Sequence, residues 1–308
     1  MPRETKHTLN EGVYAALITP RREDSASVDL AAALELVDFA ARGGADGVAI
    51  LGATGEFVHF TPEDRLHLIR FAVKRSRLPV IANVSHSTLD GAASLGREAV
   101  SLGAAALLLM PPSFFAYGQG EIREFFLRFS AAMGDHVPIL LYNLPGFTNS
   151  ISGDTAAELL STGRFAGIKD SSGDTDAFLR LKALRDRVPF GIFAGADSVF
   201  PRWRGQGADG VISGTACALP ELMVALDRSI RSGDQDRAFR FHSRLDEFLA
   251  WADRFPAPAA IREATRLRGL KAGPHAVPLG SEGERRLNDF RDWFRGWFPV
   301  VEKEISLA

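Results

Sequence analysis

The chain has 308 residues, of which 46% are hydrophobic and 24% are charged, and its formal net charge is −2. A chain of this length can bury a large core, and its balanced charge argues against a nucleic acid partner or electrostatic attachment to a membrane. The single cysteine, Cys217, cannot form an internal disulfide, the apolar runs are too short to span a bilayer, and the polar start shows no signal-peptide pattern, so we expect a cytoplasmic protein.

Eight short apolar runs alternate with amphipathic segments between about residue 12 and residue 232. Several of these runs are almost continuous in Val, Ile, Leu and Ala, which is typical of strands buried on both faces of a parallel sheet. The expected strands are 13–20, 47–52, 79–84, 104–110, 138–144, 165–169, 190–194 and 210–213.

The segments between the apolar runs have helical spacing. In the second of them, Thr61 has the pattern of a helix N-cap, and Pro62 follows at the first helical position with acids in the first turn. The expected helices are 29–43, one that begins after Thr61, 87–103, 121–133, 155–162, 174–187, a short 198–207, and 219–231.

Strand–helix alternation at this pace indicates βαβ units, and eight of them fit a closed (β/α)8 TIM barrel. An open doubly wound sheet is the alternative, although the Gly-x-Gly-x-x-Gly turn expected after its first strand is absent. The remaining sequence predicts three helices, at 235–253, 259–267 and 282–298. We therefore expect a barrel over residues 1–232 and a C-terminal helical extension, packed on the barrel, over residues 233–308.

Two residues at expected strand ends could carry chemistry, because active sites of such barrels lie at the C-terminal ends of the strands. Lys169 ends the sixth run, and burial there favours the neutral amine, which is the nucleophile in Schiff-base formation. Tyr142 ends the fifth run, where its phenol could relay protons. Each residue alone also has an ordinary structural explanation: a packed lysine stem with its head in solvent, and a core tyrosine with a bonded hydroxyl.

The turn after the second run, Gly52-Ala53-Thr54-Gly55-Glu56, offers backbone N–H groups and the Thr54 hydroxyl to an anion such as a carboxylate. By itself, this turn could equally be a tight loop. His59 and His86 have no partners at metal-ligand spacing, so we expect no metal site and interpret both histidines as structural or rim residues.

Three segments together form a specific pattern: Gly52-Ala53-Thr54-Gly55-Glu56, Tyr142-Asn143-Leu144-Pro145-Gly146 and Gly167-Ile168-Lys169-Asp170. In this order and at strand ends, they resemble the main motifs of the dihydrodipicolinate synthase / N-acetylneuraminate lyase family, over about residues 12–290. The resemblance implies a (β/α)8 barrel with a C-terminal helical extension, usually a homotetramer, and a lyase that needs no cofactor.

The resemblance also implies roles for particular residues. Lys169 matches the Schiff-base lysine and Tyr142 the proton-shuttling tyrosine. Thr54, with Ala53 and Gly55 beside it, matches the turn that holds the pyruvate carboxylate, and Ile212 matches a position next to the lysine.

Departures from the family pattern bear on the substrate. Ala53 stands where dihydrodipicolinate synthases have a relay hydroxyl, Phe114 where they have a second tyrosine, and Phe147 where they have an arginine for the aldehyde's carboxylate. A methyl group and two phenyl rings cannot relay protons or pair with a carboxylate. Sialic-acid lyases have an Asp-Glu pair after strand seven, and here only Asp197 of that pair remains.

We therefore expect a Schiff-base-forming aldolase or dehydratase that acts on pyruvate or a 2-keto-3-deoxy sugar acid. Phe57, Phe114, Phe115 and Phe147 suggest an apolar pocket for the second substrate. The alternatives are a dihydrodipicolinate synthase-like condensation of pyruvate with an aldehyde, and a non-catalytic barrel that binds a 2-oxo acid.

Overall fold

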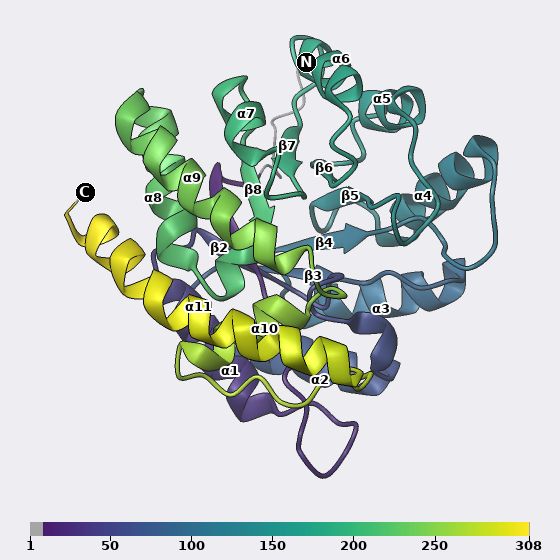
Figure 1. The fold of residues 1–308 in the computed structure, drawn as a ribbon. Helices are drawn as coiled ribbons and strands as arrows, with labels where there is room; N and C mark the ends of the chain where they lie inside the picture. The colour runs from purple at the N-terminus through teal and green to yellow at the C-terminus, as the bar shows by residue number, and fades with distance from the viewer. Residues whose placement is uncertain (1–8, 308) are drawn as a thin grey trace.

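The computed structural model describes residues 9–307, which fold into a closed barrel of eight parallel strands in the order β1 to β8 (Figure 1). The predicted barrel is confirmed, and the alternative of an open sheet is wrong. The strands are β1 (Gly12–Ala16), β2 (Gly47–Ile50), β3 (Val80–Asn83), β4 (Ala106–Leu109), β5 (Ile139–Asn143), β6 (Gly167–Asp170), β7 (Gly191–Ala194) and β8 (Gly210–Ser213).

Most of the strands are shorter than the apolar runs that predicted them. The first run continues to Pro20, but β1 ends at Ala16. Two residues later the N–H of Ile18 donates to Cys217 Sγ at 3.4 Å instead of to a neighbouring strand. The apolar residues beyond the strand ends therefore pack in loops at the C-terminal end of the barrel, where side chains for chemistry also lie.

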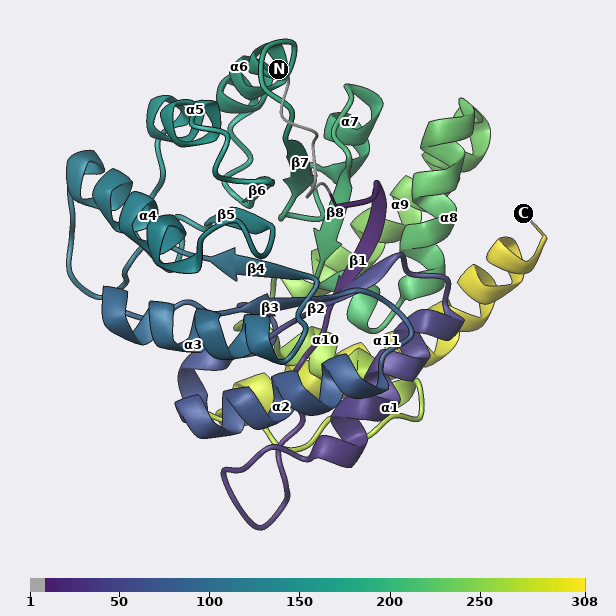
Figure 2. The same ribbon diagram turned by 180° about the vertical axis from the view of Figure 1, so that it is seen from behind.

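Helices follow the strands and surround the barrel, as the opposite view in Figure 2 shows. The predicted start of the second helix is confirmed, because Thr61 Oγ1 accepts a hydrogen bond from the N–H of Asp64 and Pro62 is the first helical residue. The helices are α1 (Leu30–Arg42), α2 (Pro62–Arg75), α3 (Leu89–Ser101), α4 (Gln119–Met133), α5 (Gly153–Ser161), α6 (Thr175–Leu184), α7 (Phe200–Gly205) and α8 (Pro220–Ser232).

Strand alternation divides the barrel core into an inner and an outer layer. An inner cluster fills the barrel, and a larger outer cluster lies between strands and helices. The inner cluster is Tyr14, Ala16, Ala49, Ile81, Ala106, Leu108, Met110, Leu140, Tyr142, Phe193 and Ile212. Tyr142 and Ile212 thus face the barrel interior.

Three helices follow α8: α9 (Gln235–Ala252), α10 (Ala259–Leu267) and α11 (Ser281–Ser306), and α11 runs along α10 (Figure 1). The prediction ended the last helix at residue 298, eight residues too early. That prediction stopped before Pro299, which lies inside α11. The helix continues because Val301 is fully buried and Ile305 packs on the core, so tertiary contacts outweigh the missing N–H of one proline.

A buried ion pair joins α7 to α8, and its loss should destabilise the barrel. Arg204 is buried, and its Nε donates to Asp227 Oδ1 at 2.7 Å. Burial raises the pKa of Asp227, and Arg204 counteracts that effect. Arg204→Ala removes the buried partner that donates a hydrogen bond to this carboxylate, so we expect a loss of about 3–5 kcal/mol in the free energy of unfolding, measured by urea titration.

The matched control for that variant is Arg231→Ala. Arg231 approaches the other oxygen of Asp227 at 3.8 Å, but its side chain is 54% exposed. An exposed partner of this kind is worth about 0–1 kcal/mol. If both variants lost the same free energy of unfolding, the buried pair between Arg204 and Asp227 would not be the source of the stability.

Candidate active site

Lys169 and Tyr142 lie side by side at the C-terminal end of the barrel. Lys169 belongs to β6 and Tyr142 to β5, and the two residues are directly paired in the strand register. The Lys169 Nζ lies 4.2 Å from the centre of the Tyr142 ring. Both residues are almost fully buried, at 3% and 2% exposed. The structure therefore brings together the two residues that the sequence singled out most strongly.

Apolar side chains surround this pair. Ile212 of β8 and Phe193 of β7 belong to the same inner cluster as Tyr142, and Phe193 is paired with Lys169 in the strand register. An amine in apolar surroundings beside a phenol is the arrangement that Schiff-base catalysis uses, because the amine attacks a carbonyl and the phenol can move protons.

A buried carboxylate holds the ends of the same two strands from the outer side. Asp170 Oδ1 accepts hydrogen bonds from Asn143 Nδ2 at 3.1 Å and from the N–H of Ser172 at 2.8 Å. Asn143 Oδ1 in turn accepts from the N–H of Ile151 at 2.9 Å. This network fixes the positions at which β5 and β6 end, and therefore the positions of Tyr142 and Lys169.

Burial raises the pKa of Asp170 above its ordinary value of 3.8, although its hydrogen bonds oppose the effect. The folded state therefore binds the proton more tightly than the unfolded state, and the stability linked to this proton is lost as pH rises from about 4 through the folded-state pKa. Asp170→Asn keeps the accepting oxygen and carries no charge. We expect its free energy of unfolding, relative to the native protein, to increase with pH.

Urea unfolding of both proteins between about pH 4 and pH 8 measures this difference. Asp176→Asn, which removes an exposed charge from the following helix, is the control for net charge. A relative stability of Asp170→Asn that falls with pH would show that the carboxylate is the preferred state of the folded protein.

The Gly52–Glu56 turn follows β2 and has a constrained backbone. Leu51 and Glu56, at its two sides, have φ values of 60° and 51°, which non-glycine residues rarely adopt. A side chain at Gly55 would place its Cβ 2.8 Å from the N atom of Leu51, so only glycine fits there. Thr54 is half-buried, and its Oγ1 lies next to Gly214, just after β8.

Arg262, on α10, holds this turn from the C-terminal helices. The arginine is fully buried, and its Nη2 donates to Glu56 Oε2 and to the carbonyl of Thr19, while Nη1 donates to the carbonyl of Ala272. Arg262 was not among the site residues expected from the sequence. Its position in the helix could have indicated burial, because an arginine among Ala260, Thr265 and other residues of the buried face of α10 needs a partner inside the protein.

The remaining predicted site residues occupy different positions around the barrel end. Asp197, after β7, accepts a hydrogen bond on Oδ2 from the N–H of Thr215 at 2.9 Å, while its Oδ1 is buried with no partner among residues 9–307. Ala53 is half-buried, and its carbonyl accepts from the N–H of Glu56. Phe147 is 65% exposed in the loop after β5.

The expected apolar pocket for a second substrate is not formed within one chain. Phe114 and Phe115 pack edge to face at 5.1 Å and are 93% and 66% exposed. Phe147 is also exposed, so most of the surface of all three rings is open rather than covered by other side chains of the chain. Phe57 is the exception, since it lines a cavity beside the Gly52–Glu56 turn. The sequence could suggest aromatic rings near the site but could not tell which of them would be covered.

The described residues 9–307 contain no group of three or more His, Cys, Asp or Glu side chains that could hold a metal ion. His59 lies 3.4 Å from Glu56, and His86 Nδ1 accepts from the N–H of Thr88 at 3.1 Å. Within the same residues, no helix is both long enough and apolar enough to cross a membrane.

A closed (β/α)8 barrel with a buried lysine and tyrosine at the ends of adjacent strands has the architecture of the Schiff-base-forming barrel lyases. Comparison with known proteins gives the family. The model of the dihydrodipicolinate synthetase family matches residues 9–294. The chain therefore belongs to the dihydrodipicolinate synthetase family, and it is a lyase.

Individual relatives agree with this assignment. The 4-hydroxy-tetrahydrodipicolinate synthase of Methanosphaerula palustris is 31% identical over 275 residues, which cover 87% of this chain and 93% of the relative. The crystal structure of dihydrodipicolinate synthase from Aquifex aeolicus has a TM-score of 0.85 at 28% identity and covers 94% of this chain and 98% of its own. A Ruminococcus gnavus sialic acid aldolase, at 22% identity, shares the fold with a TM-score of 0.83 and covers 94% and 97% of the two chains.

Proposed function

We propose that the protein is an aldolase or dehydratase that binds a 2-keto-3-deoxy sugar acid as a Schiff base on Lys169. The observation that carries the proposal is the contact between the Lys169 amine and the Tyr142 ring, inside a barrel that belongs to a family of Schiff-base-forming lyases. Ala53, Phe114 and Phe147 support a sugar acid over an aldehyde with its own carboxylate, because none of these side chains can pair with an anion.

In the proposed mechanism, the neutral Lys169 amine attacks the C2 carbonyl of the substrate, and Tyr142 moves protons while the carbinolamine forms and loses water. The resulting iminium withdraws electrons from C3. An aldolase then breaks the C3–C4 bond as the C4 hydroxyl loses its proton, which releases an aldehyde and leaves an enamine. Protonation of the enamine and addition of water return the amine and pyruvate.

A dehydratase would use the same iminium differently. It would remove a proton from C3 and then expel the C4 hydroxyl as water, with both carbons retained in the product. In either case the N–H groups of the Gly52–Glu56 turn and the Thr54 hydroxyl would orient the substrate carboxylate, and Ile212 would pack beside the lysine. Asp197 would bind a hydroxyl group of the sugar acid, because its Oδ1 has no partner within residues 9–307.

A panel of 2-keto-3-deoxy acids, assayed separately for pyruvate release and for water loss, tests the proposal. We expect turnover of at least one panel member. Treatment with pyruvate and borohydride should also leave a reduced adduct that mass spectrometry locates on Lys169. If neither an adduct nor turnover is found, the proposed function is wrong.

A second candidate is the synthase reaction, which condenses pyruvate with an aldehyde. The observation that favours it is the name of the relative from Methanosphaerula palustris at 31% identity. Turnover of pyruvate with aspartate semialdehyde in a coupled assay would replace the first proposal. Pyruvate binding without turnover of any substrate would instead support a non-catalytic 2-oxo-acid-binding barrel.

A homotetramer is part of the proposal. Phe114, Phe115, Tyr117 and Phe147 expose aromatic rings on the loops after β4 and β5, and such clusters usually mark protein–protein contacts. Sedimentation analysis should give the mass of four chains and would contradict this part if it gave the mass of one. We also propose a cytoplasmic location, since the one cysteine, Cys217, is buried and unpaired, which suits a reducing compartment.

A further inference from the structure

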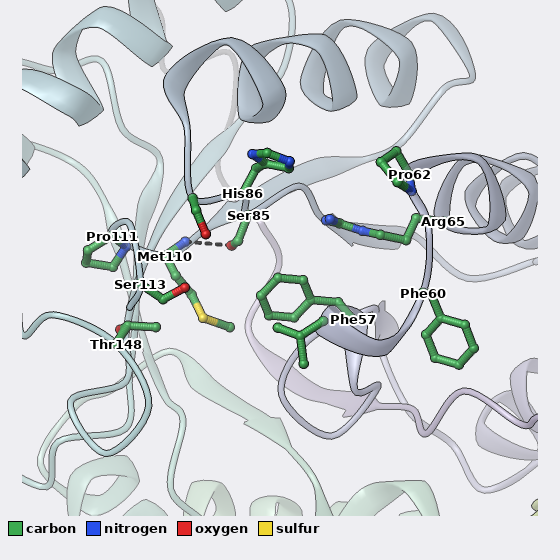
Figure 3. Close-up of a pocket in the computed structure, with 12 residues that line it drawn as sticks. Phe57, Phe60, Pro62, Arg65, Ser85, His86, Met110, Pro111, Ser113 and Thr148 are labelled. Atoms are coloured by element: carbon green, nitrogen blue, oxygen red, sulfur yellow. Dashed lines mark hydrogen bonds between the residues drawn. The ribbon is translucent and has the colours of Figure 1, made fainter. Parts of the chain in front are cut away.

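The Gly52–Glu56 turn and the residue after it contact two different parts of the molecule. Phe57 lines the cavity shown in Figure 3, where its ring centre lies 5.0 Å from Cζ of the buried Arg65. Glu56 is instead paired with Arg262 of α10. The conformation of the turn therefore depends partly on the C-terminal helices, which lie far from it in the sequence.

Residues 268–280 join α10 to α11 without any helix or strand, and we call them the α10–α11 connection (Figure 1). Two arginines of α10 hold this connection by its backbone. Arg262 Nη1 donates to the carbonyl of Ala272, and Arg266 Nη2 donates to the carbonyl of Gly273 at 2.9 Å. A Cβ at Gly273 would clash with the backbone of the loop after β1, so the connection is also packed against that loop. The arginine that pairs with the turn thus holds the connection as well.

His275 lies in the α10–α11 connection with one ring nitrogen buried. Its Nε2 has no hydrogen-bond partner among residues 9–307, although the residue as a whole is only half-buried. Burial lowers the pKa of His275 below its ordinary value of 6.5, and the charges of Arg262 and Arg266 add to that effect. Glu263 and Glu56 oppose it. The closed connection therefore accommodates the neutral imidazole better than the imidazolium.

Glu263, the carboxylate on the α10 side, is already paired. It is buried, and one of its oxygens accepts from Arg266. The other oxygen accepts from Arg291 Nε of α11 at 2.7 Å. Two cations thus share this anion, and a protonated His275 would have to displace one of them to bind it.

Glu56, the carboxylate on the side of the turn, is also engaged. Its Oε2 accepts from Arg262, and its Oε1 lies 3.4 Å from His59 Nδ1. Arg21, in the loop after β1, adds a further cation, since its Nη2 donates to the carbonyl of His59 at 3.1 Å. A proton on His275 would therefore join a group of cations whose anions are already paired.

We propose that the α10–α11 connection is an acid-sensitive switch on the Gly52–Glu56 turn, and that His275 is the group that responds to pH. A protonated His275 finds no free anion in the closed connection, so the connection leaves α10 and the imidazolium enters water. The hydrogen bonds from Arg262 and Arg266 to the connection are then broken. Because Arg262 loses one of its three acceptors and becomes hydrated, it holds Glu56 less firmly and the turn loosens.

The size and the direction of the effect follow from proton linkage. The histidine of an open connection has the ordinary pKa of 6.5, and that of the closed connection has a lower pKa. Each pH unit below 6.5 therefore favours the open form about tenfold, until the pH reaches the pKa of the closed form. The stability linked to His275 is present above pH 6.5 and is lost as the pH falls.

Hydrogen exchange followed by mass spectrometry tests the switch without any substrate. The native protein and His275→Gln are compared at the same pH, so that the chemical rate of exchange cancels. At pH 8 the two proteins should exchange alike. At pH 5 residues 268–280 and residues 52–57 should exchange about tenfold faster in the native protein. His67→Gln, which removes an exposed histidine from α2, should exchange as the native protein does.

His275→Lys tests the same switch in the opposite direction. Its side chain is charged throughout this pH range, so residues 268–280 should exchange rapidly even at pH 8. Equal exchange of the native protein and His275→Gln at pH 5 would overturn the proposal, and so would slow exchange of His275→Lys at pH 8. Faster exchange confined to residues 268–280, with residues 52–57 unchanged, would also overturn it, because the connection would then open without acting on the turn.

The effect on catalysis rests on the proposed function, in which the Gly52–Glu56 turn binds the substrate carboxylate. KM for the 2-oxo acid should then rise below pH 6.5 more steeply in the native protein than in His275→Gln. The ionisation of Lys169 is common to both proteins and does not enter the comparison. If exchange shows the turn loosening while the two KM values stay equal, the switch is confirmed and the role assigned to the turn is wrong.

Discussion

Lys169→Met should abolish the borohydride-trapped pyruvate adduct and lower kcat/KM by about a thousandfold or more, because the amine that forms the covalent intermediate is gone. Methionine has a similar length and suits the apolar surroundings at the end of β6, so the barrel should remain folded. Mass spectrometry after treatment with pyruvate and borohydride, together with steady-state kinetics on the best substrate of the panel, measures both effects.

The control for this variant is Lys182→Met, which removes an exposed lysine from α6. It should form the adduct and turn over substrate as the native protein does. An adduct that persists in Lys169→Met would mean that another amine carries the chemistry, and the assignment of Lys169 would have to be abandoned. Tyr142→Phe complements the pair, since it should form the adduct more slowly while keeping the nucleophile.

Arg262→Ala should lower both the stability of the folded protein and its affinity for the substrate carboxylate. It leaves Glu56 without its buried partner and removes a bond to Thr19, so we expect a loss of about 3–5 kcal/mol in the free energy of unfolding. Because Arg262 acts on Thr54 only through the Gly52–Glu56 turn, it is a positioning residue. Its loss should raise KM for the 2-oxo acid more than it lowers kcat.

Arg262→Lys separates the two effects, because it keeps the charge beside Glu56 but not the second and third hydrogen bonds. Arg262→Lys should recover much of the KM and part of the stability. Arg266→Ala is the matched control, since Arg266 lies one turn further along α10 and its side chain is 40% exposed. If Arg262→Ala changed kcat but not KM, Arg262 would not act by positioning the Gly52–Glu56 turn.

The barrel could be predicted from the sequence because the patterns that indicate its strands and helices are local. Each strand is a short apolar run and each helix an amphipathic segment, so their alternation can be counted without knowing any long-range contact. The helix that begins after Thr61 was foreseen for the same reason, since an N-cap and a proline act within one turn. The end of α11 was misplaced because Pro299 is a local stop signal, whereas the burial of Val301 is a tertiary effect.

The meeting of Lys169 and Tyr142 could also be predicted, because adjacent strands of a barrel end at the same side. The exposure of the aromatic rings that were expected to form a pocket could not be predicted. Phe114, Phe115 and Phe147 are apolar residues in a region where apolar residues usually pack, and only the loop conformations show that their rings are exposed.

By itself, then, the sequence determined the barrel, its family pattern and the lysine–tyrosine pair. Strand order in a barrel follows chain order, so residues at strand ends are brought together without further information. The tertiary structure alone decided that Arg262 reaches Glu56 across 206 positions of sequence and that Arg65 is buried with no counter-ion among residues 9–307. Both outcomes depend on which side chains are buried together, and burial is set by packing between distant segments, which no local pattern encodes.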